Sequence, residues 1–388
     1  MFSDRLPRLV PNRLSRARAR QRSFIDLTES NPTRVGLPYP PALLEPLGEA
    51  AGLRYDPQPL GLDVAREAAA AEYRRRGVTV PAGRVVITAS TSEAYSLLFK
   101  LLCNPGDQVL VPRPSYPLFE HLTRLDAVEA VAYDLEYDGG WRTDPDAIGR
   151  GVTARTRAVL LVSPNNPTGS VAGAGELAAV GALCRRRGLA LVGDEVFADY
   201  ALVGDGPAGP SVLAAPEALT FGLGGLSKSV GLPQVKLGWL AVGGPDDLAR
   251  AALERLEVIA DAYLSVSTPA QLAAPRLLAD GAAVRAEILR RVRTNLAQLD
   301  EAILAHPACT RLRADGGWSA VLQVPAIDAE ETLVLRLLER RGVLVHPGYF
   351  FDFPREAFLV VSLLPEPGAF RAGVARTLED IQGLGGVG

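Results

Sequence analysis

Lysine is almost absent from this chain of 388 residues. The sequence holds only Lys100, Lys228 and Lys236, and its other permanently cationic side chains are arginines. A chain with this bias can place arginine wherever a surface cation is needed, so a retained lysine indicates a task that a guanidinium group cannot perform. Nucleophilic attack on an aldehyde is one such task, because an ammonium group can lose its proton when it is desolvated or lies near other cations.

Cysteine and histidine are equally scarce, with three of each. The cysteines at 103, 184 and 309 are widely separated and show no Cys-x-x-Cys spacing, which argues against a disulfide framework and a structural zinc site. The histidines at 121, 306 and 346 are scattered too, so we expect no bound metal. Reduced thiols, with an Ala/Arg/Gly/Pro bias typical of a GC-rich bacterial genome, indicate a cytoplasmic protein.

Long apolar runs and an excess of charge are also missing. No run reaches the roughly 18 residues that a bilayer-spanning helix needs, so we expect no membrane anchor. The net charge of −3 gives no reason to expect nucleic-acid binding. Residues 5–22 are rich in arginine and poor in acids, as in an organellar transit peptide, but Leu14 and Ala17 favour a solvated helix instead. The length and the 48% hydrophobic content predict a globular enzyme of two domains.

Short apolar runs alternate with helical stretches through the first two thirds of the chain. Helices are expected at 62–76 and 93–102, and strands at 85–88, 108–111, 158–162, 189–192 and 218–223. This alternation predicts a mostly parallel sheet covered by helices, with ligands bound beyond the carboxyl ends of the strands. A long helical region at 270–304 then leads to a smaller α+β unit, with which the N-terminal arm is expected to pack.

Polar residues follow several of these strands. Thr88–Ala94 places small hydroxyl residues between a strand and a helix, where free backbone N–H groups suit a phosphate, although serine and threonine are also ordinary helix N-caps. Ser163–Gly169, with the sequence Ser-Pro-Asn-Asn-Pro-Thr-Gly, is a rigid turn in its simplest interpretation. It also holds an amide at a fixed place, ready to donate a hydrogen bond to a ring oxygen.

Three further side chains complete the pattern. Asp194 closes a buried strand, where a carboxylate is costly unless it is paired; a protonated pyridine nitrogen would provide the pair, and a helix N-cap is the alternative. Lys236 follows Lys228 by eight residues and supplies a cation that can neutralise phosphate and lower the pKa of the first lysine. Tyr116 offers an aromatic face after the strand at 108–111.

These parts are the ones needed to hold pyridoxal phosphate. Their order and spacing resemble the class I/II aminotransferases of the fold-type-I pyridoxal-phosphate family, over nearly the whole chain and most specifically at Ser163–Gly169, Asp194-Glu195 and Ser227–Trp239. By this resemblance Lys228 forms the Schiff base with the cofactor and Asp194 pairs with the pyridine nitrogen. The resemblance implies further cofactor contacts from Asn166 to the phenolic oxygen, from Tyr116 to the ring face, and from Ser90, Thr91, Ser92 and Lys236 to the phosphate. Ser227 is also expected to bind the cofactor.

The resemblance also implies an architecture and an assembly. The family fold is a large cofactor domain, built on a mostly parallel seven-stranded-type sheet, with a smaller α+β domain made from both termini. We therefore expect an N-terminal arm at residues 1–45, a large domain at 46–284 and a small domain at 285–388. Tyr55 matches a tyrosine that reaches the phosphate of the neighbouring subunit, which implies a homodimer with shared active sites.

Four positions depart from the family pattern. Phe197 stands where a tyrosine usually donates to the phenolic oxygen, Lys236 where arginine is commoner, and Gly225 where a serine often contacts the phosphate. Val360 stands where the family carries an arginine that grips the substrate α-carboxylate, and valine cannot form that bidentate clamp. The nearest candidates to replace it are Arg34 and Arg355.

The expected function is that of a pyridoxal-phosphate-dependent aminotransferase, which moves an amino group between an amino acid or related amine and a 2-oxo acid through Lys228. Phe197 and Val360 keep open a lyase or decarboxylase on the same fold. A non-catalytic effector-binding domain is a third interpretation. It is disfavoured because about two dozen residues precede the family-like core, too few for an added DNA-binding domain.

Overall fold

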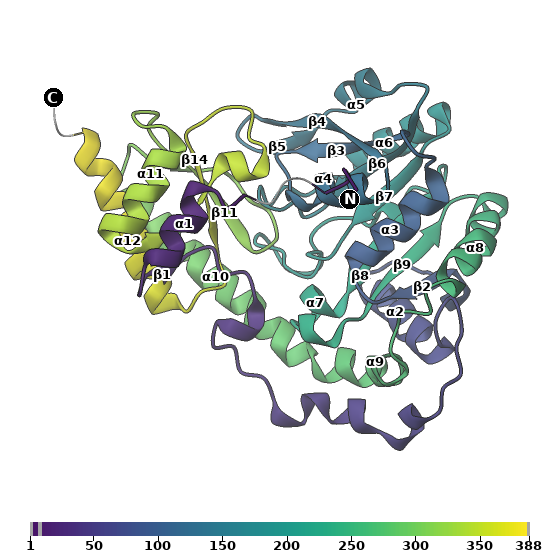
Figure 1. The fold of residues 1–388 in the computed structure, drawn as a ribbon. Helices are drawn as coiled ribbons and strands as arrows, with labels where there is room; N and C mark the ends of the chain where they lie inside the picture. Colours follow the sequence, from purple (N-terminus) through teal and green to yellow (C-terminus); the bar gives the residue numbers. More distant parts are fainter. Residues whose placement is uncertain (1–2, 7–9, 386–388) are drawn as a thin grey trace.

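A large sheet forms the centre of the molecule in the computed structural model, which describes residues 3–6 and 10–385 (Figure 1). Within those residues the sheet has eight strands, in the order β2 (Val85–Thr88), β9 (Gly238–Gly243), β8 (Thr220–Gly225), β7 (Ala190–Asp194), β6 (Thr156–Val162), β3 (Gln108–Arg113), β4 (Glu129–Tyr137) and β5 (Trp141–Thr143). Strand β9 is antiparallel to both of its neighbours, and β5 is antiparallel to β4. The prediction of a mostly parallel sheet is confirmed, and the short hairpin strand β5 extends it beyond seven strands.

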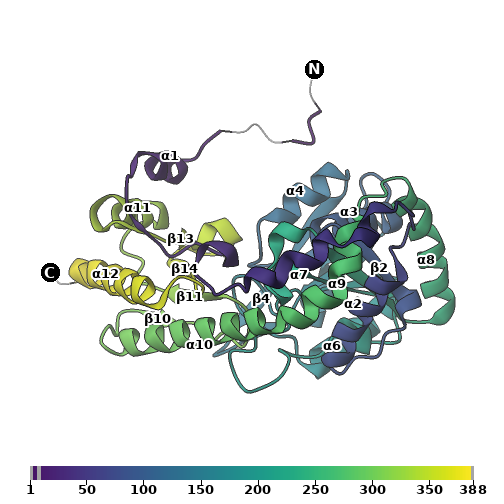
Figure 2. The same cartoon turned by 90° about the horizontal axis from the view of Figure 1, so that it is seen from below.

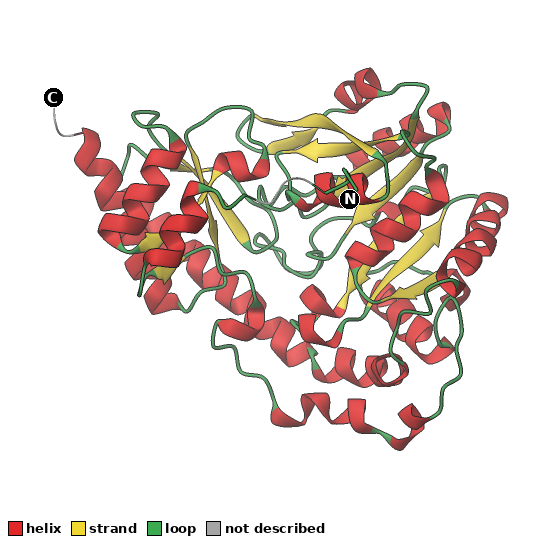
Figure 3. Cartoon of the chain, in the orientation of Figure 1, coloured by secondary structure: helices red, strands yellow, loops and turns green. Residues whose placement is uncertain are grey.

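Helices cover both faces of this sheet (Figure 3). One apolar cluster joins the strands to α3 (Thr91–Leu102) and α8 (Asp246–Asp261), and the opposite cluster joins them to α5 (Pro145–Gly151) and α6 (Ala174–Arg187). Side chains therefore alternate between two buried faces along each strand, as with Val159 and Leu160, which explains the uninterrupted apolar runs in the sequence. Helix α2 (Asp63–Arg75) occupies the stretch expected to be helical at 62–76.

The small domain is a second sheet with helices on one side. Of the described chain, four strands form it, in the order β10 (Thr310–Arg311), β11 (Ser319–Gln323), β14 (Phe358–Ser362) and β13 (His346–Pro347). Helices α10 (Ala282–Leu304) and α12 (Pro367–Gly385) pack together beside it, with α11 (Glu330–Arg336) near the N-terminal arm. Figure 2 shows α10 running from the large domain into the small one.

The helical region expected at 270–304 is divided. Helix α9 (Thr268–Asp280) packs on α2, and α10 begins after Gly281. A Cβ atom at Gly281 would lie 2.5 Å from the Leu277 carbonyl oxygen and 2.7 Å from Val230 Cβ, so only glycine fits this junction. The break directs α10 away from the large sheet.

The N-terminal arm contributes to both domains. Helix α1 (Arg13–Arg20) lies against α11, and β1 (Ile25–Asp26) pairs in parallel with β12 (Val343–Leu344), so both ends of the chain build the small domain, as predicted. The expectation of a solvated helix was wrong for Leu14 and Ala17, which are buried in the core. Further along, η2 (Pro41–Gly48) and η3 (Ala50–Leu53) lie on α9. The domain limits at 45/46 and 284/285 stay a prediction.

Two further elements connect these parts. Helix α4 (Leu118–Leu125) follows β3, and α7 (Leu226–Ser229) follows β8, so each begins at the carboxyl edge of the large sheet.

Among the described residues, none of the helices combines the length and the apolar character needed to cross a membrane.

Candidate active site

The carboxyl ends of the parallel strands bring the polar motifs to one edge of the sheet. Asp194, the last residue of β7, is level with Val162 of β6 and Leu223 of β8. The main chain locks this edge, because Ser163 N–H donates to the Asp194 carbonyl at 3.0 Å and Glu195 N–H donates to the Leu223 carbonyl at 3.2 Å. The turn at 163–169 and the lysine motif therefore begin on either side of Asp194.

Lys228 lies in α7, directly after β8. Its Nζ atom lies 5.0 Å from the ring centroid of Trp318 and 5.7 Å from that of Phe197. Burial lowers the pKa of Lys228, and the nearby Asp194 carboxylate opposes this effect. A lysine with a lowered pKa more often has a neutral amino group, and the neutral amine can attack a carbonyl carbon.

Asp194 is a buried carboxylate with neutral hydrogen-bond donors. The Tyr95 hydroxyl donates to Oδ2 at 2.9 Å, and the Val196 N–H donates to Oδ1 at 3.2 Å. Burial raises the pKa of Asp194, while these two hydrogen bonds lower it. A buried carboxylate with this balance favours a cationic partner, so its chemistry fits a protonated pyridine nitrogen.

The neighbouring Glu195 has a different role. Its Oε1 atom accepts hydrogen bonds from the Ser211 hydroxyl at 2.6 Å and from the Val212 N–H at 2.8 Å, and Arg76 lies 3.3 Å from its Oε2 atom. The two hydrogen bonds satisfy Oε1, and the ion pair with Arg76 balances the charge of Glu195. Of the two acids that close β7, Asp194 is therefore the one whose charge is left for a ligand.

The turn between β2 and α3 has the form of an anion cradle. Ser90 is the N-cap of α3, and its hydroxyl accepts the Glu93 N–H at 3.1 Å. Thr91 and Ser92 follow in the first turn, where N–H groups have no acceptor within the helix. Gly238 of β9 lies against this turn: a Cβ atom there would meet the Ser90 carbonyl carbon at 3.1 Å. The cradle thus depends on a close approach of two main-chain segments.

Two other predicted cofactor contacts lie on the segment that follows β8. Ser227 precedes Lys228 in α7, and Lys236 has an exposed side chain on left-handed backbone with φ 60°. A cradle, a lysine with a lowered pKa and a buried carboxylate together suit pyridoxal phosphate. The residues present therefore fit that cofactor.

The two asparagines of the turn at 163–169 are used differently. Asn165 is buried, and its amide donates to the Pro114 carbonyl and to the Thr168 hydroxyl, both at 2.9 Å. This side chain ties the turn to the loop that carries Tyr116, whose ring is 45% exposed. Asn166 instead accepts a long hydrogen bond of 3.5 Å from Ser319. Its amide N–H groups are thus the ones available to a ligand.

Phe197 places an aromatic face, and no hydroxyl, beside Lys228. It is buried, with its ring edge-on to Trp318 at 5.3 Å between centroids. Tyr200 is the nearest alternative donor in sequence, but its hydroxyl donates to the main-chain carbonyl of Lys228. Tyr200 therefore holds the lysine backbone and does not replace the missing phenolic donor.

Val360 lies in the apolar face of the small sheet. It pairs with Val321 on β11 and His346 on β13, and its side chain is 2% exposed. Ser319 shares the face of Val321 and contacts Asn166, so this face borders the turn at 163–169. A substrate carboxylate at Val360 would have no cation from β14.

Neither Arg34 nor Arg355, the two candidates to bind the substrate carboxylate, forms a hydrogen bond with the residues around Val360. The Arg355 guanidinium lies over the Phe358 ring, 5.4 Å from its centroid, and Phe358 shares the face of Val360. Arg34 ends η1 (Pro32–Arg34) in the N-terminal arm and is exposed. Within residues 3–6 and 10–385 neither guanidinium forms an ion pair.

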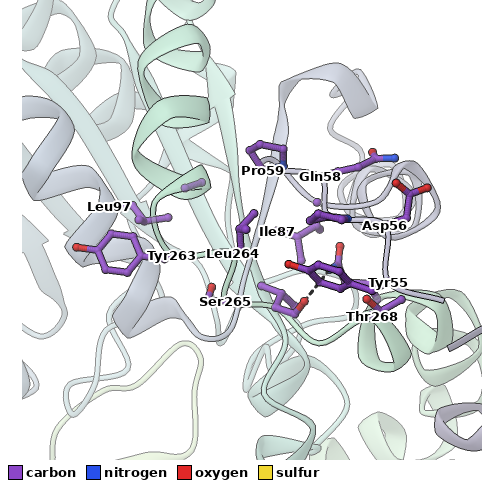
Figure 4. Close-up of a pocket in the computed structure, with 15 residues that line it drawn as sticks. Tyr55, Asp56, Gln58, Pro59, Ile87, Leu97, Tyr263, Leu264, Ser265 and Thr268 are labelled. Atoms are coloured by element: carbon purple, nitrogen blue, oxygen red, sulfur yellow. Dashed lines mark hydrogen bonds between the residues drawn. The ribbon is translucent and has the colours of Figure 1, made fainter. Parts of the chain in front are cut away.

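Tyr55 lies apart from these residues in a surface groove. Its side chain is 70% exposed, and Figure 4 shows it with Tyr263, Leu264 and Thr268 among the residues that line the groove. None of the other predicted cofactor contacts lines this groove. One subunit therefore does not bring Tyr55 to Lys228.

Sequence reasoning missed two side chains. Trp318, one of three tryptophans, precedes β11 and presents its ring to Lys228. Tyr95 lies one helical turn after Thr91, on the same side of α3. That spacing from the hydroxyl cluster was a signal that could have found Tyr95.

Residues 42–382 match the family of aminotransferases of class I and II. The chain is similar to the glutamate-pyruvate aminotransferase AlaA of Haemophilus influenzae, with 32% identity over 316 residues, 78% of this chain and 77% of that protein. It is also similar to the alanine aminotransferase of Mycobacterium tuberculosis, with 31% identity over 305 residues, 75% of this chain and 69% of that protein.

Solved structures agree with this result. An aminotransferase from Escherichia coli is 26% identical, with a TM-score of 0.83 over 95% of this chain and 93% of that one. The alanine aminotransferase of Pyrococcus furiosus, at 23% identity, shares the fold with a TM-score of 0.86 over 95% of each chain. The chain therefore belongs to the class I and II aminotransferases and is a pyridoxal-phosphate-dependent enzyme of that family.

Proposed function

We propose that this aminotransferase carries its cofactor on Lys228 and pairs the pyridine nitrogen with Asp194. The observation that carries the proposal is the placement of the two residues: Lys228 lies in α7 directly after β8, and Asp194 ends the neighbouring strand β7. Burial lowers the pKa of Lys228 and raises that of Asp194, so the lysine is prepared to act as a nucleophile and the carboxylate to receive a cation. When bound there, pyridoxal phosphate supplies an electron sink for the bond that breaks at the substrate carbon.

The remaining cofactor contacts follow from the shared edge of the sheet. We propose that Ser90, Thr91, Ser92 and Lys236 bind the phosphate, that Asn166 donates to the phenolic oxygen, and that Tyr116 covers the ring. Ser227 is a further proposed cofactor contact. Lys228 Nζ is then the base that takes the proton from the substrate carbon bearing the nitrogen. The rings of Trp318 and Phe197 beside Nζ exclude water from that proton transfer.

We also propose that the active enzyme is a cytoplasmic homodimer. Tyr55 is 70% exposed, and the nearby side chains Leu53 and Tyr263 are 90% and 55% exposed. Burial of these side chains by a second copy would bring each Tyr55 towards the phosphate of the other subunit. The three free cysteines suit a reducing compartment.

The substrates proposed are an amino acid, or a related amine, and a 2-oxo acid. Similar chains are named for glutamate, pyruvate and alanine, which supports small α-amino acids as donors. Because Val360 offers no charge, we propose that Arg34, or failing that Arg355, supplies the cation for the carboxylate.

A single turnover with an amino acid donor tests the reaction. We expect wild type to end with the cofactor in its amine form and one equivalent of 2-oxo acid released. Return of the starting spectrum with release of ammonia would instead show elimination. Lys228→Ala should release no 2-oxo acid. Lys100→Ala is a matched control, because Lys100 of α3 pairs with Asp126 at the end of α4 and has no part in the proposed site.

A further inference from the structure

We propose that Tyr95 is a positioning residue that keeps the Asp194 carboxylate ionised and oriented towards the cofactor ring nitrogen. The inference rests on the proposed function, since it requires Asp194 to pair with that nitrogen. It assigns a role to a tyrosine of α3 that contacts neither Lys228 nor the turn at 163–169 through a hydrogen bond.

The contact is direct and enclosed. Tyr95 is 3% exposed, and its hydroxyl donates to Asp194 Oδ2 at 2.9 Å. Its ring packs edge-on to Phe119 at 5.3 Å between centroids and is stacked on Phe99 at 6.1 Å, with 28° between the two planes. These two rings fix the phenol, so the hydroxyl reaches the carboxylate in one orientation.

The hydrogen bond acts on charge as well as on position. A donor to a buried carboxylate stabilises the ionised form and opposes the desolvation that raises the pKa of Asp194. The pKa of Tyr95 is raised well above its usual value, first by burial and then by Asp194, so Tyr95 stays protonated and can only donate to this carboxylate. With Val196 N–H on Oδ1, each oxygen keeps a lone pair for the cofactor.

Helix α3 links this contact to the phosphate cradle. Thr91 and Ser92 lie in the first turn of α3 and Tyr95 in the next turn. One rigid helix therefore sets the distance between the phosphate end of the site and the carboxylate that meets the ring nitrogen. A purely packing role for Tyr95 would need its ring and not its hydroxyl.

The test compares the affinity of the apo-enzyme for pyridoxal phosphate with its affinity for the analogue in which carbon replaces the ring nitrogen. Wild type should prefer the natural cofactor, since only its ring nitrogen can pair with Asp194. Tyr95→Phe should lower this preference by about tenfold, the scale of one hydrogen bond to a charged group, and should leave the affinity for the analogue nearly unchanged. Equal losses for both ligands, with the preference preserved, would overturn the inference.

Two further variants separate the possible failures. Tyr133→Phe is the matched control, because Tyr133 is a buried tyrosine whose hydroxyl donates to the Leu160 carbonyl at 2.8 Å; its preference should equal that of wild type. In an Asp194→Asn background, Tyr95→Phe should no longer change the preference. If Asp194→Asn alone keeps the full wild-type preference, the proposed pairing of Asp194 fails; if it loses the preference and Tyr95→Phe does not, the role of Tyr95 alone fails.

Discussion

Replacing Phe197 by tyrosine tests the electrostatics around the cofactor ring. Phe197 is 8% exposed, and its ring centroid lies 5.7 Å from Lys228 Nζ and 5.3 Å from the centroid of Trp318. The substitution adds one hydroxyl to a side chain that already lies in the site. That hydroxyl restores the donor to the phenolic oxygen that is usual in the family.

The size of the effect follows from the charge on that oxygen. A hydrogen bond to a charged group contributes about 1.5 to 3 kcal/mol, and about 1.4 kcal/mol corresponds to one pKa unit. The donor stabilises the deprotonated form, whose oxygen is negative, so the spectral pKa of the bound cofactor should fall. We expect a shift of about one to two units towards lower pH.

The assay is the visible absorbance of the holoenzyme as a function of pH. Wild type, Phe197→Tyr and Phe197→Leu are compared, and the leucine variant shows the effect of changing this position without adding a donor. Tyr200 does not mask the effect, because its hydroxyl donates to the Lys228 carbonyl. An unchanged spectral pKa, or a shift to higher pH, in Phe197→Tyr would show that the added hydroxyl does not donate to the phenolic oxygen.

The other predictions concern the substrate and the stability of the fold. Arg34→Ala should lower kcat/KM for carboxylate-bearing donors by a factor equivalent to about 2 to 4 kcal/mol of transition-state binding, while the affinity for the cofactor stays unchanged. If Arg34→Ala has normal kinetics and Arg355→Ala shows this loss, Arg355 is the residue that binds the carboxylate. Glu195→Gln should lower the free energy of unfolding by about 3 kcal/mol, because the buried Arg76 loses its charged partner; a loss under about 1 kcal/mol in chemical denaturation would contradict this. Burial lowers the pKa of His346 from 6.5 to about 4, so between these values the unfolded chain binds more protons than the folded one. The contribution of neutral His346 to the free energy of unfolding is fully present above pH 6.5 and falls by about 2 to 3 kcal/mol as the pH drops towards 4. His346→Asn should make the free energy of unfolding less dependent on pH over that range. An unchanged pH dependence in denaturation experiments would argue against this prediction.

The architecture was largely predictable because its signals are local. Apolar runs such as 158–162 mark strands buried on both faces, and polar residues directly after them must meet at one edge of a parallel sheet. Asp194 and Lys228 could therefore be predicted to lie at the same edge. It could not show that Asn165 is used internally while Asn166 is left for a ligand, because the two amides are adjacent and differ only in their tertiary partners.

The contacts that could not be predicted from the sequence join residues that are far apart along the chain or depend on tertiary packing. Trp318 contacts Lys228 from the small domain, although it lies 90 residues after Lys228 in the sequence. Tyr95 has the spacing of a core residue of α3, and only the position of Asp194 shows that its hydroxyl has a charged partner. Leu14 looked solvated because its neighbours are arginines, yet the narrow apolar side of α1 is buried against the small domain.

The proposed function depends on Lys228 as the residue that carries the cofactor. Borohydride reduction of the holoenzyme, followed by proteolysis and mass spectrometry, measures directly which lysine bears the reduced pyridoxyl group. We expect one modified site per subunit, at Lys228. Label on Lys100 or Lys236 with Lys228 unmodified would contradict it.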